Sequence, residues 1–412
     1  MKKVWSVALA VCMLLALCVT ALADDTLTLD FWVRTSDDFS AEIEAFEAAN
    51  PGIKINQVQV GGNYDDLVAK YNAAIAADNL PHVGLVGQRH GIPQFYDAGK
   101  LIPIENYMTA EEQADVIDGF WVRYTYQGIR LAVPFQSSMP MMYYNQTMLE
   151  ELGLEVPKTF TEMIETARKA VKDTDNDGAT DIYGFNMASD MPWYIQPLVW
   201  CFGGKIIDED GNVTINTPEM QQVLTLFGDM VRDGVMPANQ HGTAQTDFTN
   251  GTLLFYFTSC ASKSSIQSAV GDNFQYNMAF FPSEKELNVC IGGNGLAIFA
   301  SDDAHQEAAA KFIKFMISPE AISQSTLERG YMPFTHAQFD SELIQSRMED
   351  PIWKVVLDQV EYIKGQNIHP ADSTIWNELT ALLSELEANP DMDINAALDA
   401  IQAEVDEFMM LY

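Results

Sequence analysis

The feature that most constrains this chain is an alternation of strand and helix patterns over residues 27–86. Apolar and polar side chains alternate over residues 27–31, as in a half-buried strand, and apolar side chains then recur at helical spacing until Asn50-Pro51-Gly52 ends the helix. The same reasoning predicts a strand at 53–60, a helix at 64–77 and a strand at 83–86. Strands that alternate with helices form a parallel sheet covered on both faces, so the sequence predicts an α/β fold.

A second α/β unit is predicted to begin near Val133, where two prolines separate one strand from another at 141–144. A helix is predicted at 159–172, another strand at 291–300 and an amphipathic helix at 306–317. The last 60 residues are predicted to be helical. The chain has 412 residues, with 22 Phe, 15 Tyr and 7 Trp, which is enough apolar material for two or three domains and excludes a disordered acidic chain.

The formal net charge is −35, and no run of Lys or Arg offsets it. An acidic surface repels phosphate backbones, so we expect no binding to nucleic acid. Beyond residue 23 the cysteines are Cys201, Cys260 and Cys290, an odd number at wide spacing. This pattern specifies neither a disulfide framework nor a zinc site. One disulfide among them, or three small buried apolar side chains, both fit this pattern.

The N-terminus has the pattern of a secretory signal peptide over residues 1–23. Lys2 and Lys3 precede an almost wholly apolar stretch, and cleavage is predicted near Ala23. Lipid attachment at Cys18 is the alternative, but Leu17 stands where a small residue is required. No later segment has about 18 uninterrupted apolar residues. We therefore expect an exported protein, periplasmic or associated with the cell surface, and released rather than lipid-anchored.

Ligands of open α/β sheets bind beyond the carboxyl ends of the strands. The loops that follow the first three predicted strands are residues 34–37, 61–64 and 87–90. All three are polar and two contain glycine, so these loops are candidates for a binding site.

The chain resembles the extracellular solute-binding proteins of ABC importers, in the group that includes the maltose-binding and glycerol-3-phosphate-binding proteins. The resemblance covers nearly the whole chain after the signal peptide and rests on segments in the family's order, among them "AFEAANPGIKI", "GNYDDLVAKYNAAIAADNLPHV", "VPFQSSMPMMYYNQTMLEELGL", "DGATDIYGF", "GGNGLAIF", "AAAKFIKFMISPEA" and "RGYMPFTHAQFD". It implies a two-lobe periplasmic-binding-protein fold, similar to maltose-binding protein, with a ligand cleft between the lobes.

Carried over to this chain, the resemblance places lobe 1 at 24–132 plus 291–331 and lobe 2 at 133–290 plus 332–412. Few residues then connect the lobes, near Val133, Gly292 and Tyr331. Such lobes can close as rigid bodies on a ligand that contacts both of them.

The resemblance also implies cleft residues. The segments that match the glycerol-3-phosphate binders carry Tyr64, Ser138, Ser259, Gly293 and Tyr331 at the matching positions. Trp193 matches an aromatic residue that covers the ligand, and the other tryptophans are expected in the core or at the rim, namely Trp32, Trp121, Trp200, Trp353 and Trp376. Aromatic faces suit the C–H side of a sugar or polyol, and hydroxyl groups exchange hydrogen bonds with it.

Two positions depart from the family pattern. Gln88 stands in place of a carboxylate, and the segment "QNIHPADSTIW" has no arginine to pair with phosphate. Arg89 is the one basic side chain we identify as a substitute. A neutral saccharide or polyol is therefore the expected ligand, with glycerol-3-phosphate or a glycerophosphodiester as the alternative.

An acidic loop begins like a calcium-binding loop. Asp173, Asp175 and Asp177 alternate, and Asp181 occupies the ninth position, but the twelfth is Gly184 instead of glutamate. Both a structural calcium site and a solvated acidic turn fit this pattern.

The motifs of serine hydrolases, zinc proteases and P-loop enzymes are absent from the sequence. We expect a monomeric binding protein that is not an enzyme, requires no cofactor and works with the transmembrane permease subunits of an importer. A carboxylate pair for glycoside hydrolysis is defined in space, so the sequence alone does not exclude it.

Overall fold

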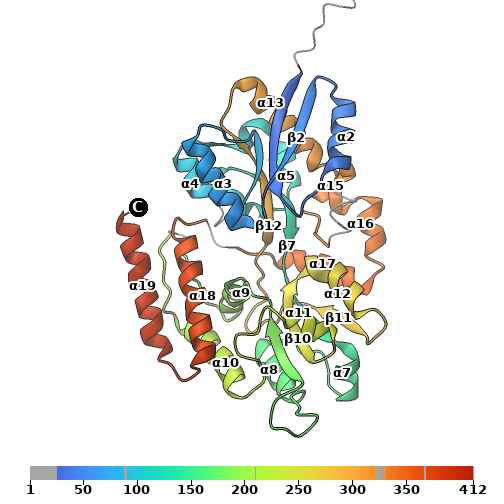
Figure 1. The fold of residues 1–412 in the computed structure, drawn as a ribbon, viewed down its shortest axis with the longest axis vertical. Coiled ribbons are helices and arrows are strands. Elements are labelled where there is room, and N and C mark those ends of the chain that lie inside the picture. The colour runs from blue at the N-terminus through green and yellow to red at the C-terminus, as the bar shows by residue number, and fades with distance from the viewer. Residues whose placement is uncertain are drawn as a thin grey trace, which may run out of the picture.

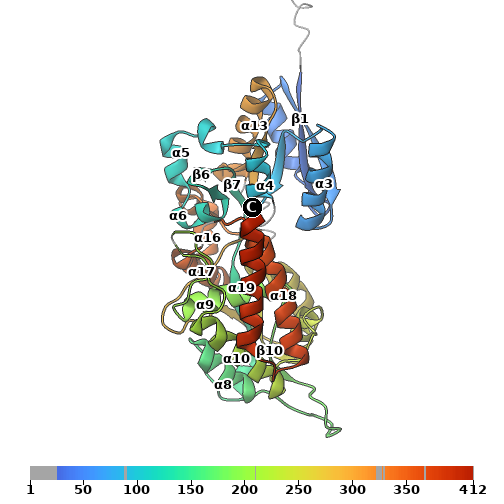
Figure 2. The same ribbon diagram turned by 90° about the vertical axis from the view of Figure 1, so that its left-hand side faces the viewer.

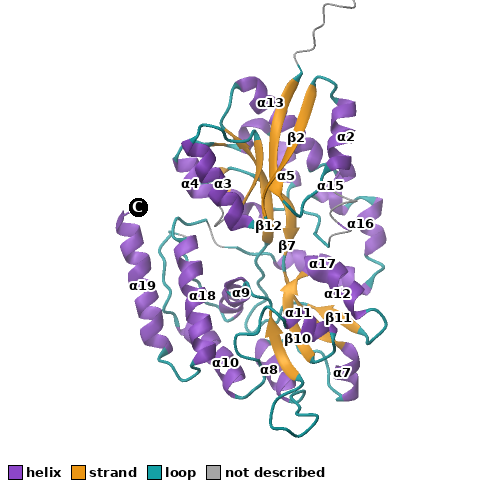
Figure 3. Cartoon of the chain, viewed as in Figure 1, coloured by secondary structure: helices purple, strands orange, loops and turns teal. Residues whose placement is uncertain are grey.

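The computed structural model describes residues 26–87, 91–208, 210–321, 327, 330–365 and 368–411. The chain forms two lobes stacked along the long axis of the molecule, each built around one β-sheet (Figure 1). Helices lie on both sides of these sheets (Figure 3). This arrangement is the two-lobe α/β fold that the sequence analysis predicts.

The first lobe contains a sheet in the order β2-β1-β3-β12-β4, with β7 beside β12. Its strands are β1 (Leu27–Arg34), β2 (Ile53–Gly61), β3 (Val83–Val86), β4 (Leu101–Ile102), β7 (Val133–Ser138) and β12 (Gly292–Phe299). Strands β1, β2 and β3 are parallel, as predicted, whereas β12 is antiparallel to β3, β4 and β7. A short hairpin pairs β5 (Thr125–Tyr126) with β6 (Ile129–Arg130).

The helices around this sheet are α2 (Ser40–Ala49), α3 (Tyr64–Ala76), α4 (Ile92–Asp97), α5 (Ala110–Asp115), α6 (Asp118–Trp121), α13 (Asp303–Met316) and α15 (His336–Phe339), with 3₁₀ turns at Ile104–Tyr107 and Val122–Tyr124. Helix α3 buries Leu67 and Tyr71 on one face because these residues are four apart, about one turn. Tyr71 stacks on Trp32 of β1 with ring centroids 5.7 Å apart, which fixes the helix against the sheet.

The second lobe contains a sheet in the order β11-β8-β10-β9. Its strands are β8 (Pro140–Asn145), β9 (Tyr183–Met187), β10 (Leu253–Ser259) and β11 (Tyr276–Ala279). Its helices are α7 (Gln146–Glu151), α8 (Phe160–Arg168), α9 (Pro192–Cys201), α10 (Pro218–Arg232), α11 (Ala244–Thr249), α12 (Lys263–Val270), α16 (Glu342–Arg347), α17 (Pro351–Gln359), α18 (Asp372–Ala388) and α19 (Ile394–Leu411), with 3₁₀ turns at Cys260–Ser262 and Val360–Tyr362. Helices α18 and α19 pack side by side, and the end of α19 reaches the level of α4 in the first lobe (Figure 2).

The connections between the lobes lie next to one another. The chain passes from β7 of the first sheet to β8 of the second at Met139, and returns through residues 289–291 to β12. A third segment runs beside them, where Met332 N–H donates to the Ser137 carbonyl at 2.9 Å. The first passage thus follows β7 and lies beyond Val133. The predicted residue ranges of the two lobes stay a prediction.

Cys201, Cys260 and Cys290 are buried and free of disulfides, and burial raises the pKa of each thiol to about 12. They pack as small apolar side chains. Within the described part of the chain, no helix has the length and apolar character needed to cross a membrane.

Candidate functional site

A cavity of about 280 Å³ lies between the two lobes. Six of the eight residues predicted for the site line it, namely Tyr64, Ser138, Trp193, Ser259, Gly293 and Tyr331. Gln88 and Arg89 lie outside the described residues. The structure therefore brings together side chains that are more than 260 positions apart in the sequence.

Strands β7 and β12 form one wall of the cavity, where Ser138 pairs with Gly292 and Ser137 with Gly293. Gly293 has a φ of 94°, and a Cβ atom there would lie 1.7 Å from the Gln136 carbonyl oxygen. At Gly292 a Cβ atom would lie 2.5 Å from Cζ2 of Trp193. Only glycine fits this close packing, which leaves backbone open to the cavity.

Tyr64 enters the cavity because it is the first residue of α3. The Asn63 side chain caps the helix by accepting a hydrogen bond from Asp66 N–H at 2.9 Å. The Tyr64 hydroxyl accepts a hydrogen bond from Asn294 Nδ2 at 2.9 Å, and burial raises the pKa of Tyr64 to about 12. This side chain therefore stays neutral and offers the cavity a ring face and a hydroxyl.

Arg34, at the end of β1, supports Tyr64 from its ring face. The guanidinium donates from Nε and Nη2 to Asp37 at 3.0 Å each, and from Nη2 to Gln136 Oε1 at 2.9 Å. Burial works against the charge, but Tyr64 and Asp37 outweigh it and keep the pKa of Arg34 above its ordinary value. Gln136 Oε1 also accepts from Asn294 Nδ2 at 2.7 Å, so the network is continuous from β1 to β12.

The second lobe contributes an aromatic wall and a hydroxyl. Trp193 follows Pro192 in the first turn of α9, and the residue is 8% exposed. Its backbone N–H donates to the Asp190 carbonyl at 3.0 Å. Ser259 ends β10, and its Oγ accepts from Ala261 N–H at 3.1 Å. Trp376 of α18, expected in the core or at the rim, lines the same cavity.

Sequence reasoning missed three charged residues as members of the site, namely Arg34, Arg123 and Asp190. Arg123 donates from Nη1 to the Ile291 carbonyl at 2.8 Å, and its Nε is buried with no hydrogen-bond partner among the described residues. The cavity therefore has two basic side chains, Arg34 and Arg123, that the sequence analysis did not name as substitutes for the missing arginine, and the role predicted for Arg89 stays a prediction. Arg34 was recoverable from the predicted loop 34–37, whereas no motif marks Arg123 or Asp190.

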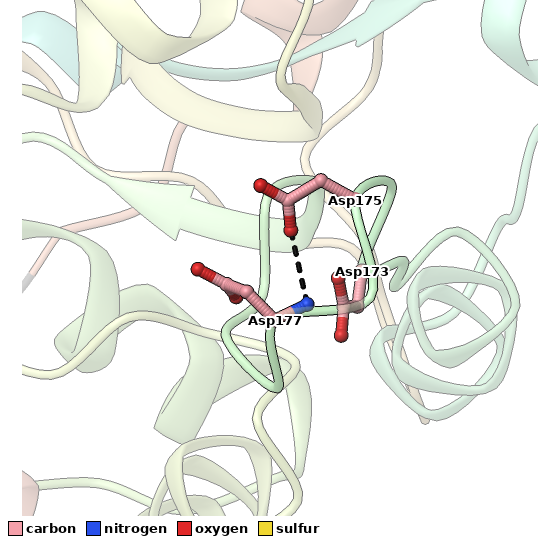
Figure 4. Close-up of side chains that lie close together, drawn as sticks. All are labelled: Asp173, Asp175 and Asp177. Carbon is pink, nitrogen blue, oxygen red and sulfur yellow. Dashed lines mark hydrogen bonds between the residues drawn. The ribbon is translucent and has the colours of Figure 1, made fainter.

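The acidic loop between α8 and β9 extends from the second lobe at the end away from the first (Figure 1). Asp173, Asp175 and Asp177 place carboxylate oxygens within 4.8 Å of one another (Figure 4). Asp181, included in the predicted metal set, instead accepts a hydrogen bond from Thr174 N–H at 2.7 Å and is not in this group. All three clustered carboxylates accept hydrogen bonds from backbone N–H groups of their own loop.

Comparison with known proteins agrees with this architecture. Residues 41–351 match the family described as bacterial extracellular solute-binding protein. A maltotriose-binding protein of Pyrococcus abyssi is 24% identical over 383 residues, which is 89% of this chain and 78% of the relative. The chain belongs to the bacterial extracellular solute-binding protein family.

Solved structures share the fold. UgpB from Mycobacterium tuberculosis in complex with glycerophosphocholine aligns with a TM-score of 0.80 and 22% identity, over 93% of this chain and 98% of that one. The maltodextrin-binding domain MalE of Bdellovibrio bacteriovorus bound to maltotriose aligns with a TM-score of 0.77 and 19% identity, over 93% and 100%. The fold is thus the two-lobe, maltose-binding-protein-like fold that the sequence analysis predicts. The family, the Pyrococcus abyssi protein and the MalE domain are described by what they bind, and UgpB is described in complex with glycerophosphocholine.

Proposed function

We propose that the protein captures a saccharide or polyol in the cleft between its lobes and delivers it to the permease subunits of an ABC importer. The observation that carries this proposal is the gathering of aromatic faces, hydroxyls and open backbone from both lobes around one cavity. A ligand that contacts both lobes stabilises the closed form in proportion to those contacts. Tyr64, Ser138, Trp193, Ser259, Gly293 and Tyr331 are the proposed contacts.

The charges around the cavity favour a neutral ligand. Arg34 is paired with Asp37, and Arg123 and Asp190 add one charge of each sign. The described residues at this site therefore carry almost no net charge. Charged side chains of both signs can still exchange hydrogen bonds with vicinal hydroxyl groups.

The remaining elements follow from the same proposal. A signal peptide cleaved near Ala23, with release preferred over lipid attachment at Cys18, would place a monomer in the periplasm or at the cell surface. Ligand capture by hydrogen bonds and aromatic contacts requires no cofactor and no turnover. Calcium at Asp173, Asp175 and Asp177 stays a separate prediction, which calcium titration of the metal-free protein would test.

A thermal-shift screen tests the proposed function. Purified protein is mixed with mono-, di- and oligosaccharides, polyols and glycerophosphodiesters, and a ligand of the native state raises the melting temperature by mass action. Each hit is then recovered and analysed, and we expect it to be chemically unchanged. A screen in which no saccharide or polyol shifts the melting temperature would contradict the proposal, and cleavage of a hit would indicate an enzyme.

A glycerophosphodiester is the second candidate, and Arg123 favours it because this half-buried cation has no carboxylate partner among the described residues. A phosphate held by Arg123 would lose affinity in high salt, whereas a neutral ligand would not. Submicromolar binding of glycerophosphocholine, abolished by Arg123→Gln, would replace the first candidate with the second.

A further inference from the structure

A second and larger cavity, of about 780 Å³, is lined by residues of α3 and α18, the helices that also contribute to the first. It is bounded by α3, α4 and the β5–β6 turn in the first lobe and by the start of α18 and the end of α19 in the second. It therefore lies between the lobes, like the central cavity. Its volume is within the usual range for ligand sites, about 300–1,000 Å³.

The two cavities are neighbours along the same two helices. Tyr64 of α3 lines the central cavity and Val68, four residues later, lines the second. On α18, Trp376 lines the central cavity and Asp372, four residues earlier, lines the second. Residues four apart share one helix face about 6 Å apart, so one extended ligand can follow both helices from one cavity to the other.

The chemistry of the second cavity suits uncharged hydroxyl groups. Gln127, an exposed residue of the first lobe, and Thr374, a half-buried residue of the second, line it, and their amide and hydroxyl groups can exchange hydrogen bonds with hydroxyl groups. Phe408 of α19 adds an apolar face. The described lining includes no lysine or arginine, so it offers no cationic side chain to pair with an anionic group.

We infer that the ligand is an uncharged oligosaccharide chain, with one end in the central cavity and further sugar units in the second cavity. This inference rests on the proposed function and adds to it the length of the ligand. Gln127 and Thr374 are then contacts for the distal sugar units, and affinity grows with chain length until the second cavity is filled.

Isothermal titration calorimetry with length ladders tests the inference. The probes are glucose oligomers of one to six units, joined by α-1,4, β-1,4 or β-1,3 bonds. Thr374→Trp fills the second cavity from α18, and Asn377→Trp on the same helix is the matched control because Asn377 is exposed and lines neither cavity. Gln127→Gly removes the other contact without strain, since glycine readily adopts the φ of 52° found there.

In the wild type we expect affinity to rise about tenfold or more between the shortest bound member and the longer ones. Thr374→Trp and Gln127→Gly should remove that gain and leave the shortest member's affinity unchanged, while Asn377→Trp behaves as wild type. Equal affinity for all bound lengths would overturn the inference and leave the proposed function standing. A wild type that binds no member of any ladder, but binds a polyol or a glycerophosphodiester, would overturn the inference as well.

Discussion

The guanidinium of Arg34 lies over the ring of Tyr64, with its central carbon 4.7 Å from the ring centroid. Asn294 constrains the other end of the same side chain, because its Nδ2 donates a hydrogen bond to the Tyr64 hydroxyl. The ring is therefore held by its face and by its hydroxyl group within the first lobe alone. Such preorganisation reduces the entropy that a ligand must overcome on binding.

Arg34→Lys should weaken ligand binding by about 1–3 kcal/mol, roughly 5- to 150-fold, although the charge is kept. Lysine cannot donate simultaneously to both Asp37 oxygens and Gln136 while covering the Tyr64 ring. Calorimetry with a hit from the thermal-shift screen measures the loss. Arg168→Lys is the control, because its pair with Asp233 is exposed on the surface. Unchanged affinity in a folded Arg34→Lys protein would show that the network does not position Tyr64.

Trp193→Ala should cost a similar amount of binding free energy, about 1–3 kcal/mol, because a desolvated aromatic face is removed from the cleft. Trp193→Phe keeps an aromatic face and should retain most of the affinity. The melting temperature of each unliganded variant separates loss of contact from loss of fold. If Trp193→Ala binds as tightly as the wild type, Trp193 is a core or rim residue.

Gly293→Ala should unfold or distort the cleft, whereas Gly128→Ala should be tolerated. Both glycines have positive φ values, 94° and 79°, so both substitutions cost about 1 kcal/mol in backbone strain. Only at position 293 does the new Cβ meet a backbone oxygen, that of Gln136. Urea denaturation should therefore show a loss of more than about 3 kcal/mol for Gly293→Ala alone. Equal losses for the two variants would mean that strain, and not the overlap, determines the outcome.

Ligand should bring the lobes closer together. Three neighbouring segments join them, so closure requires little rearrangement inside either lobe. Small-angle scattering with and without a saturating ligand should give a smaller radius of gyration for the complex, and a sugar that does not bind serves as the control. An unchanged radius with confirmed binding would argue against closure.

Much of the fold is predictable from local sequence patterns. The strand predicted at 83–86 is β3, and the helix predicted at 64–77 is α3, since capping and apolar spacing act over a few residues. The helix predicted from residue 306 begins at Asp303 because Asp302 caps it by accepting from His305 N–H. The helix predicted to reach residue 172 ends at Arg168. Lys172 lies beyond its end and pairs with Ile182 in an isolated bridge.

The site is less predictable because it is assembled by long-range packing. Tyr64 and Ser138 lie in segments that resemble known binding proteins, so their positions in those segments were enough to predict them as site residues. Arg123 lies in a 3₁₀ turn, and it reaches the cleft only because residues 289–291 pass beside it and accept its hydrogen bond at Ile291. Periodicity and spacing carry no information about that contact. The antiparallel placement of β12 has the same origin, since its partners β3, β4 and β7 are remote in sequence.

The pairing of Ser138 with Gly292 bears on the order in which a ligand would contact the protein in the proposed closing motion. These residues lie beside the passages between the lobes, so in the closing motion that we propose they are near the rotation axis and travel least. Tyr64 and Trp376, on helices of opposite lobes, travel further. A ligand can therefore settle on the strand pair in the open form and keep those contacts while the helices approach. The rate of capture then depends on access to the strand pair, and the residence time depends on the helices that enclose the ligand.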